Sequence, residues 1–222
     1  MNRDRLIVNK ILNTQKMLKQ TFVNLIEKYI SNQDLLDELW NELESNYSHK
    51  KRFYHSLDHL ENILKSLLDI KIEIKNWDCI LFTLFYHDII YKAHKSNNEE
   101  KSAELAEKRM RQISVSIDMI KLCTEQILAT KSHDSSNNID TNYFTDADLS
   151  ILGKGWESYE TYYKNVRKEY SIYPDLVYNP GRRKVLNHFL SMDRIFKTEH
   201  FYAKYESNAK ENLEKELTIL GV

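Results

Sequence analysis

Histidine and aspartate residues recur along the chain in a pattern that could bind a metal ion. His55 and His59 are four residues apart, and the pair His87 and Asp88 follows the apolar run from Cys79 to Phe85. Two histidines four residues apart share one face of a helix, with Cα atoms about 6 Å apart along its axis. That spacing can bring both imidazoles to one metal ion, or one to the ion and the other to a substrate. Two partly exposed surface histidines are the simpler alternative.

The doublet His87-Asp88 would be costly to bury at the end of such an apolar segment. A buried charge must be paired or must bind a cation. Because the residues before the doublet offer few polar partners, the sequence favours a cation site over the alternative of a capping aspartate beside a core histidine.

Acidic residues in two further segments have simpler explanations when each segment is taken alone. Asp146 and Asp148 follow Thr145, and aspartate is favoured at the positive end of a helix. Thr145 and Asp148 also have the spacing of a capping box. Glu99 stands three residues after Ser96, so it too is explained as a capping-box partner.

Taken together, these segments supply a mixed nitrogen and oxygen ligand set. His59, His87, Asp88 and Asp148 come from three expected helices. Such donors suit Mn, Fe, Co, Ni or Zn, and Mg if oxygen ligands dominate. Four protein ligands leave coordination positions for water and substrate. The sequence leaves open which divalent ion binds and whether there are one or two.

The elements that would position these residues are helices. From about residue 5 to 70 the apolar residues recur at steps of three and four. Only 4 Gly and 2 Pro occur, which is few for the tight turns of a sheet protein. We expect one all-α domain, with breaks at Pro174 and Pro180-Gly181. The later helices are expected at about 96–110, 118–130, from 145 onward, 156–171, 181–191 and 199–219.

Composition argues against several classes of partner. The 32 basic and 33 acidic residues leave a net charge of -1, which gives no sign of binding to nucleic acid or to acidic membranes. No apolar run approaches the ~20 residues of a membrane span, and Arg3, Asp4 and Arg5 do not begin a signal peptide. Cys79 and Cys123 have no metal or redox spacing and are expected to be buried thiols. A cytoplasmic protein is therefore expected.

The order of these motifs resembles the H…HD…D signature of the HD-domain metal-dependent phosphohydrolases. From about residue 36 to 217 the chain is similar to a bacterial group described as predicted metal-dependent HD-superfamily phosphohydrolases. The resemblance implies a single HD-type helical bundle with its core at about residues 50–155 and additional N- and C-terminal helices. The segments that carry it are Arg52-Phe53-Tyr54-His55 with His59, His87-Asp88-Ile89-Ile90-Tyr91, Asn98-Glu99-Glu100 with Ser102, Ile127-Leu128-Ala129-Thr130-Lys131 with His133, Asp146-Ala147-Asp148-Leu149 with Leu152-Gly153, Arg167-Lys168-Glu169-Tyr170, and Tyr178 with Gly181-Arg182.

A second resemblance implies roles for individual residues. The Tyr54-His55…His59 segment and Asp148 with its neighbours are similar to motifs of the cyclic-nucleotide phosphodiesterases, which share the HD architecture. That similarity makes His59 a metal ligand and His55 the general acid, and it selects Asp148 over Asp146 as a ligand. No further phosphodiesterase motif follows the doublet, so cyclic-nucleotide hydrolysis is not implied.

The activity implied is hydrolysis of a phosphate ester, expected to be a nucleotide-like small molecule, by a metal-activated water. His55 would protonate the departing oxygen. Glu99 could orient the water, and Lys131 and His133 could bind phosphate or a second metal ion; capping and surface exposure are the alternatives for Glu99 and His133. The expected substrate-binding residues are Arg52, Arg167, Tyr170 and Arg182, for most of which a solvated helix face is the alternative.

Two other classes of function stay open. Some HD-fold proteins resemble this ligand set but hold a di-iron centre that activates oxygen, which here would require His133 and either Glu99 or Glu100 as extra ligands. The other class is a non-catalytic module that binds a metal or a nucleotide. An amphipathic helix at about residues 5–30 could pack on a partner subunit in a homo-oligomer, or on its own domain.

Overall fold

The computed structural model describes residues 16–221 and confirms the all-α class. Helices and short 3-10 turns make up the regular structure of this range, and no strand occurs in it. None of its helices is long and apolar enough to cross a membrane. The chain divides into two compact units, the first ending at His133 and the second beginning at Asp134; the single domain stays a prediction.

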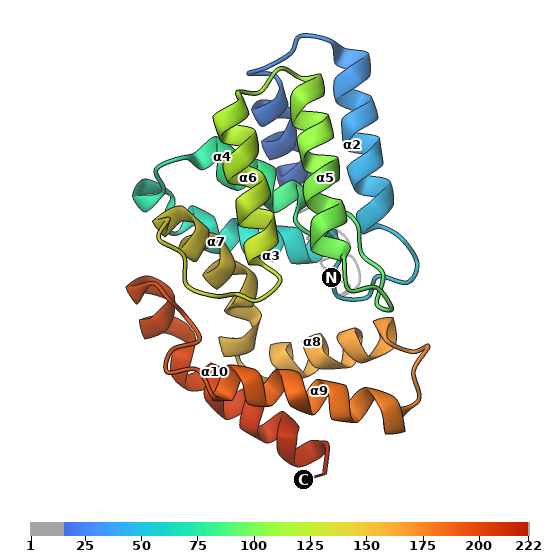
Figure 1. The fold of residues 1–222 in the computed structure, drawn as a ribbon, viewed down its shortest axis with the longest axis vertical. Coiled ribbons are helices and arrows are strands. Elements are labelled where there is room, and N and C mark those ends of the chain that lie inside the picture. Colours follow the sequence, from blue (N-terminus) through green and yellow to red (C-terminus); the bar gives the residue numbers. More distant parts are fainter. Residues whose placement is uncertain (1–15, 222) are drawn as a thin grey trace, which may run out of the picture. The chain divides into compact units, whose positions relative to one another are not determined.

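The first unit is a bundle around the apolar helix α4, of which every residue from Cys79 to Tyr86 is buried. Helices α5 and α6 lie side by side and both contact α4 (Figure 1). The elements of this unit after residues 16–26, which are helical, are α2 (Gln33–Tyr47), α3 (Leu57–Leu68), a 3-10 turn (Lys71–Glu73), α4 (Trp77–Tyr86), α5 (Asn98–Gln112) and α6 (Ile117–Ala129).

The N-terminal helix packs on its own unit over the residues that the structure describes. The ring of Phe22 lies 5.0 Å from that of Phe85 on α4 and 5.6 Å from that of Trp40 on α2. Leu18, Phe22, Leu25 and Ile26 are buried, so this face of the helix packs on its own unit; packing on a partner subunit stays a prediction. The part of this predicted helix before residue 16 lies outside the described residues.

The capping box expected at Ser96 and Glu99 is wrong. Helix α5 begins at Asn98, with Asn97 as its N-cap and no side-chain hydrogen bond at the cap. The Asn98 side chain instead accepts a hydrogen bond from the Lys92 amide and donates one to the Lys92 carbonyl, at 3.0 and 3.1 Å. The loop before α5 is therefore closed by Asn98, and capping no longer explains Glu99.

The second unit contains the remaining helices. Two of their expected ranges, 156–171 and 199–219, are confirmed to within two residues. Helices α9 and α10 contact each other, and α10 also packs on the 3-10 turn (Figure 1). The elements are α7 (Ile139–Leu149), a 3-10 turn (Ser150–Gly153), α8 (Trp156–Glu169), α9 (Asp175–Leu190) and α10 (Glu199–Ile219).

Two expected boundaries in this unit are wrong. Helix α7 begins at Ile139 rather than at Thr145, because the Asn138 side chain caps it by accepting from the amides of Asp140 and Thr141. Asp146 and Asp148 therefore lie in the last turns of a helix. Helix α9 begins after Pro174 and contains Pro180, which removes one backbone hydrogen bond without ending the helix.

A buried ion pair joins α9 to α10 inside the second unit. The Arg182 guanidinium donates to both carboxylate oxygens of Glu216, at 2.7 and 2.8 Å, and the Tyr159 hydroxyl donates to the same carboxylate at 2.5 Å. These bonds link α8, α9 and α10. Removing either charged partner would leave an uncompensated buried charge.

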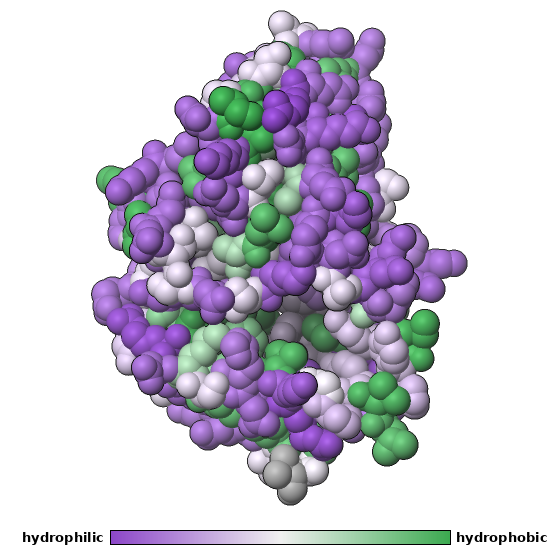
Figure 2. Space-filling view, viewed as in Figure 1, coloured by the Kyte–Doolittle hydropathy of each residue, from purple (hydrophilic) through white to green (hydrophobic). Residues whose placement is uncertain are grey.

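The surface is largely polar. On the face drawn in Figure 2, hydrophilic residues cover most of both units and apolar residues gather in separate small patches. The most exposed large apolar side chains include Ile72 on the 3-10 turn of the first unit and Leu176 on α9. Scattered exposed apolar residues are ordinary on a protein surface and indicate no particular function.

Glycine at position 153 permits the 3-10 turn to approach α10. A Cβ at this position would lie 2.8 Å from Tyr205 Cα and 2.5 Å from its carbonyl oxygen. We predict that Gly153→Ala lowers the free energy of unfolding by about 1–3 kcal/mol, because backbone atoms must move apart. Urea unfolding measures the change.

Gly181→Ala is the matched control, because nothing lies within 4 Å of its Cβ. Alanine favours a helix, so this substitution should raise stability by about 0.5–1 kcal/mol. Equal effects of the two substitutions would contradict the packing argument.

Candidate metal centre

His87 is oriented by a hydrogen bond to the end of α4. It directly follows that helix and is 1% exposed. Its Nδ1 lies 3.0 Å from the carbonyl oxygen of Leu84. A carbonyl only accepts, so Nδ1 carries the proton, and in the neutral ring Nε2 holds the lone pair. Histidines that bind metals are commonly held in this way by a second partner on the other ring nitrogen.

His59 and Asp88 face the lone pair of His87. His59 lies in the first turn of α3 and is 3% exposed, and its Nε2 is 3.3 Å from His87 Nε2. Asp88 Oδ2 lies 3.4 Å from His87 Nε2 and 3.8 Å from His59 Nε2. The structure therefore brings three of the expected ligands together in the first unit.

The donor set fits a divalent ion. Ligand atoms that bind one such ion at 2.0–2.2 Å are about 3–3.5 Å apart. The His59–His87 and His87–Asp88 distances of 3.3 and 3.4 Å fall in this range, and the His59–Asp88 distance of 3.8 Å lies above it. Two imidazole nitrogens and a carboxylate oxygen suit Mn, Fe, Co, Ni or Zn. The distance between the two Nε2 atoms also fits a hydrogen bond from a proton on His59. Several divalent ions share this preference for donors, so the geometry selects no single ion.

His55 lies at the more open edge of this group. Its side chain is 18% exposed, against 3% for His59. The imidazole stacks on Tyr91 with ring centroids 4.0 Å apart, and its Nε2 is 3.9 Å from Asp88 Oδ2. The two histidines thus share one neighbourhood but differ in burial, with His59 inside and His55 nearer to solvent.

Arg52 holds the backbone that carries Asp88. Its guanidinium donates to the carbonyl oxygens of Asp88 and Ile89, both at 2.7 Å, and to that of His55 at 3.2 Å. It also lies over the Tyr47 ring at 4.8 Å, and the Tyr47 hydroxyl accepts from the Asp88 amide. These contacts position the ligands; phosphate binding by Arg52 stays a prediction.

Tyr47 and Tyr91 also contact candidate site residues, and the sequence pattern predicted neither contact. Tyr47 lies 41 residues before Asp88 and no local pattern links the two. Tyr91 stands four residues after His87, within a segment that carries the HD resemblance, but its contact is with His55 from a distant loop. Spacing along the chain therefore offered no signal for Tyr47 and a weak one for Tyr91.

The three other expected catalytic residues of the first unit lie at the start of α5 or just after α6. Glu99 lies half-buried in the first turn of α5. Lys131 forms an exposed ion pair with Glu100 and donates to the Ser96 carbonyl at 2.8 Å. Its ammonium lowers the pKa of Glu100, and the hydrogen bond raises that of Lys131. His133 adopts a left-handed backbone conformation, with φ of 56°, just after α6.

The remaining expected site residues belong to the second unit. Asp148 lies half-buried in the last turn of α7. Arg167 donates to Asp175 and to the carbonyls of Tyr170 and Tyr173, and so closes the turn between α8 and α9. Tyr170 is the C-cap of α8, and Arg182 is buried in its pair with Glu216. Substrate contacts by these residues stay predictions.

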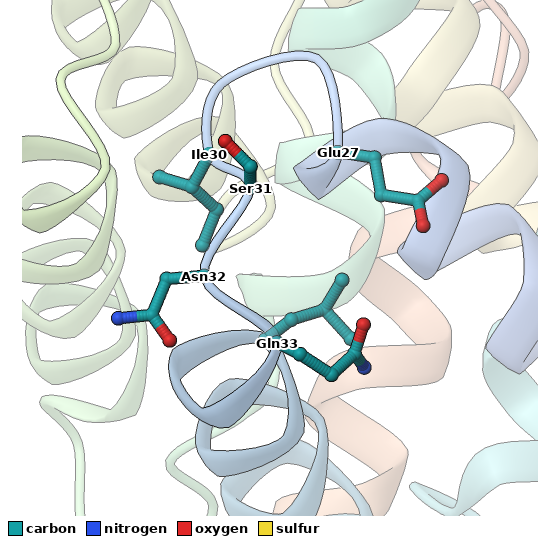
Figure 3. A pocket seen from close by; sticks show the side chains of 6 residues that line it. Glu27, Ile30, Ser31, Asn32 and Gln33 are labelled. Carbon is teal, nitrogen blue, oxygen red and sulfur yellow. The ribbon is translucent and has the colours of Figure 1, made fainter.

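A separate hollow lies beside the start of α2. It has a volume of about 280 Å³. Glu27, Ile30, Ser31, Asn32 and Gln33 line it (Figure 3), together with Leu36. No expected site residue lines this hollow, and it holds no cluster of histidine and carboxylate side chains. It is therefore not a candidate for the metal chemistry.

The contacts of Arg52 generate a test. Arg52→Lys keeps the positive charge but replaces the two guanidinium nitrogens that bond separate carbonyl oxygens with one ammonium nitrogen, so we predict a loss of about 1–3 kcal/mol of unfolding free energy and weaker metal binding. Urea unfolding and metal titration measure these changes. Arg111→Lys is the control, because its surface pair with Glu107 is exposed and should change stability by less than about 0.5 kcal/mol. If Arg52→Lys bound metal as wild type does, Arg52 would not position the ligands.

Comparisons with protein-family models, with curated proteins and with solved structures found no match for this chain. The resemblance to the HD phosphohydrolases therefore stays a prediction that depends on the order of the motifs. The geometry of His59, His87 and Asp88 is the structural observation that a functional proposal can use.

Proposed function

We propose that the chain is a metal-dependent phosphohydrolase that acts on a small, nucleotide-like phosphate ester. The observation that carries the proposal is the convergence of His59 Nε2, His87 Nε2 and Asp88 Oδ2, with His87 held by the Leu84 carbonyl. The motif order adds Asp148 as the further ligand, and His59, His87 and Asp148 are of the residue types that hold a metal ion. Imidazole and carboxylate ligands with positions left for water and substrate are typical of metal-dependent hydrolysis.

Some residues of the site are proposed to position the metal ligands, and His55 is proposed to transfer a proton. A bound divalent ion would supply an activated water and would stabilise negative charge on the phosphoryl oxygens. The Leu84 carbonyl and Arg52 keep the ligand atoms in place, and the more exposed His55 is the proposed proton donor to the departing oxygen. His59 is proposed as the ligand of the pair because it is the more buried of the two.

The remaining residues enter the proposal with less specific roles. Glu99 is proposed to orient water, since capping does not account for it. Lys131 and His133 are proposed to bind phosphate or a second metal ion. The proposed substrate-binding residues are Arg52, Arg167, Tyr170 and Arg182.

The proposal predicts that metal binding and turnover depend on the doublet. His87→Ala and Asp88→Ala should each remove most metal binding, because each takes away a donor atom. Metal analysis of the purified protein measures binding. A phosphate-release screen over nucleotides and generic phosphate esters, with Mn, Mg, Co, Ni and Zn added in turn, measures turnover. The wild-type protein should release phosphate in a metal-dependent way, and both variants should lose at least about 100-fold in rate.

The control for this experiment is His94→Ala, which removes an exposed histidine of the same unit. It should bind metal and turn over as the wild-type protein does. Bound iron with substrate-dependent oxygen uptake and no phosphate release would replace the hydrolase with the di-iron oxygenase. Metal binding that requires Asp88, without turnover of any substrate, would favour a binding module. If no metal bound to wild type, the proposed centre would be wrong.

His133 allows a second prediction, because its replacement by glycine should raise stability and lower turnover. Glycine adopts positive φ without the steric cost of a side chain, so His133→Gly should raise the unfolding free energy by up to about 1 kcal/mol. If His133 serves the reaction, the same substitution should lower turnover. Ser114→Gly is the matched control, because Ser114 has φ of 60° at the end of α5. Ser114→Gly should stabilise and leave turnover unchanged. Unchanged turnover in His133→Gly would remove His133 from the site.

A further inference from the structure

The imidazole of His55 is not oriented by a helix of its own segment. Helix α3 begins at Leu57, with Ser56 as its N-cap, so His55 lies in the irregular loop before it. A helical backbone restricts the rotamers of a side chain, and a loop lacks this restriction. The place of the imidazole, with its Nε2 at 3.9 Å from Asp88 Oδ2, is therefore set by neighbours from other segments.

Tyr91 packs against a face of that imidazole. The two rings are stacked, with an interplanar angle of 27° and centroids 4.0 Å apart. The rings of Tyr54 and His59 meet His55 edge-on instead, at angles of 80° and 73°. Rotation of the imidazole about its χ2 torsion would move ring atoms into Tyr91, since 4.0 Å is close to van der Waals contact. Tyr91 therefore limits the plane in which the imidazole of His55 can lie.

Ser102 fixes the backbone just before Tyr91. Its hydroxyl accepts from the Ile90 amide at 3.1 Å and donates to the Ile90 carbonyl at 3.3 Å. Ser102 lies on α5 and is fully buried, so water does not compete for these bonds. It is one of the residues that carry the HD resemblance, and the proposed function gave it no role. Its contacts make the ring of Tyr91 a fixed surface rather than one that moves with His55.

Arg52 joins the loop of His55 to the segment of Tyr91. One nitrogen of its guanidinium donates to the carbonyl oxygens of His55 and Asp88, at 3.2 and 2.7 Å, and the other donates to that of Ile89. The same guanidinium lies 5.6 Å from the centre of the Tyr91 ring. The backbone of His55 and the ring that stacks on its side chain are thus held by one cation.

We propose that Tyr91 is a positioning residue that holds the imidazole of His55 beside His87 and Asp88. The stack sets the plane of the imidazole, and the bonds from Arg52 and the α5 serine set where that plane lies. Tyr91 follows His87 by four residues, so one anchored segment carries two proposed metal ligands and the ring that orients His55. The separation between the ligands and His55 is thereby fixed.

This arrangement has a chemical use that rests on the proposed function, whereas the orientation of His55 does not. In that reaction, hydroxide adds to phosphorus, the bond from phosphorus to the departing oxygen breaks, and the imidazolium proton of His55 passes to that oxygen. A proton donor must lie within hydrogen-bond reach of the oxygen that it protonates. Displacement of the imidazole by about 1 Å is enough to slow such a step strongly.

NMR of the full chain, with no paramagnetic metal present, tests the orientation. In wild type, nuclear Overhauser effects should join the His55 ring protons to the Tyr91 ring and to the Asp88 β-protons. Tyr91→Leu should lose the effect between His55 and Asp88, because leucine offers no flat face, and Tyr91→Phe should retain it. Tyr202→Leu is the matched control, since Tyr202 is an exposed tyrosine of α10, and it should change neither effect. Ser102→Ala, which removes the bonds to Ile90 and no ring, should weaken the same effect even if Tyr91→Leu does not fold.

Turnover gives a readout that a purely structural role would not change. In Tyr91→Leu, kcat for alkyl phosphate esters should fall about tenfold or more at nearly constant KM, because a departing alkoxide needs a proton. For para-nitrophenyl phosphate, kcat should fall by less than about threefold, since the departing phenolate is stable without a proton. Tyr91→Phe should turn over both esters as wild type does, and metal content should be the same in all three proteins.

The outcomes separate this inference from the proposed function. An absent effect between His55 and Tyr91 in wild type, or an effect between His55 and Asp88 that persists in Tyr91→Leu, would overturn the positioning role. Loss of that effect in a protein without phosphate turnover would keep the role and reject the hydrolase. Loss of the effect with equal rate decreases for both esters would keep the role and reject His55 as the proton donor.

Discussion

The hydrogen bond between His87 Nδ1 and the Leu84 carbonyl is the constraint on which the candidate centre depends. It is available because α4 ends there, where carbonyl groups have no helical partner. The bond fixes which ring nitrogen of His87 keeps a lone pair, and this lone pair faces His59 and Asp88. The apolar length of α4 buries the ring, so its Nε2 faces His59 and Asp88 rather than solvent. In the proposed function, these three donors would share a cation.

Two further charged side chains have backbone groups as hydrogen-bond partners, unlike the buried pair of Arg182 and Glu216. Arg52 in the first unit uses its guanidinium on carbonyl oxygens, and Asp146 in the second uses its carboxylate on amides. Both side chains fix a backbone segment next to a proposed ligand and are themselves satisfied.

Several expectations failed for a common physical reason. A capping pattern such as Ser96 to Glu99, or Thr145 to Asp148, is only a local preference. The cap forms only where tertiary packing permits it. Asn98 instead bonds the backbone of Lys92 in the loop before α5, and Asn138 caps α7 at an earlier position, through the amides of Asp140 and Thr141. Pro180 likewise marks a break by its local chemistry but is held within α9 by the surrounding structure.

The helical class, the burial of α4 and the residue types of the candidate metal site were predictable from the chain, because they follow from periodicity, composition and the chemistry of side chains. The adjacency of His87 and Asp88 was visible in the chain. Tertiary structure alone decided that His59 Nε2 faces His87 Nε2, that Arg52 holds the backbone of Asp88, and that Tyr91 stacks on His55. These contacts join residues tens of positions apart. Sequence spacing does not predict them, because they form only when the helices pack.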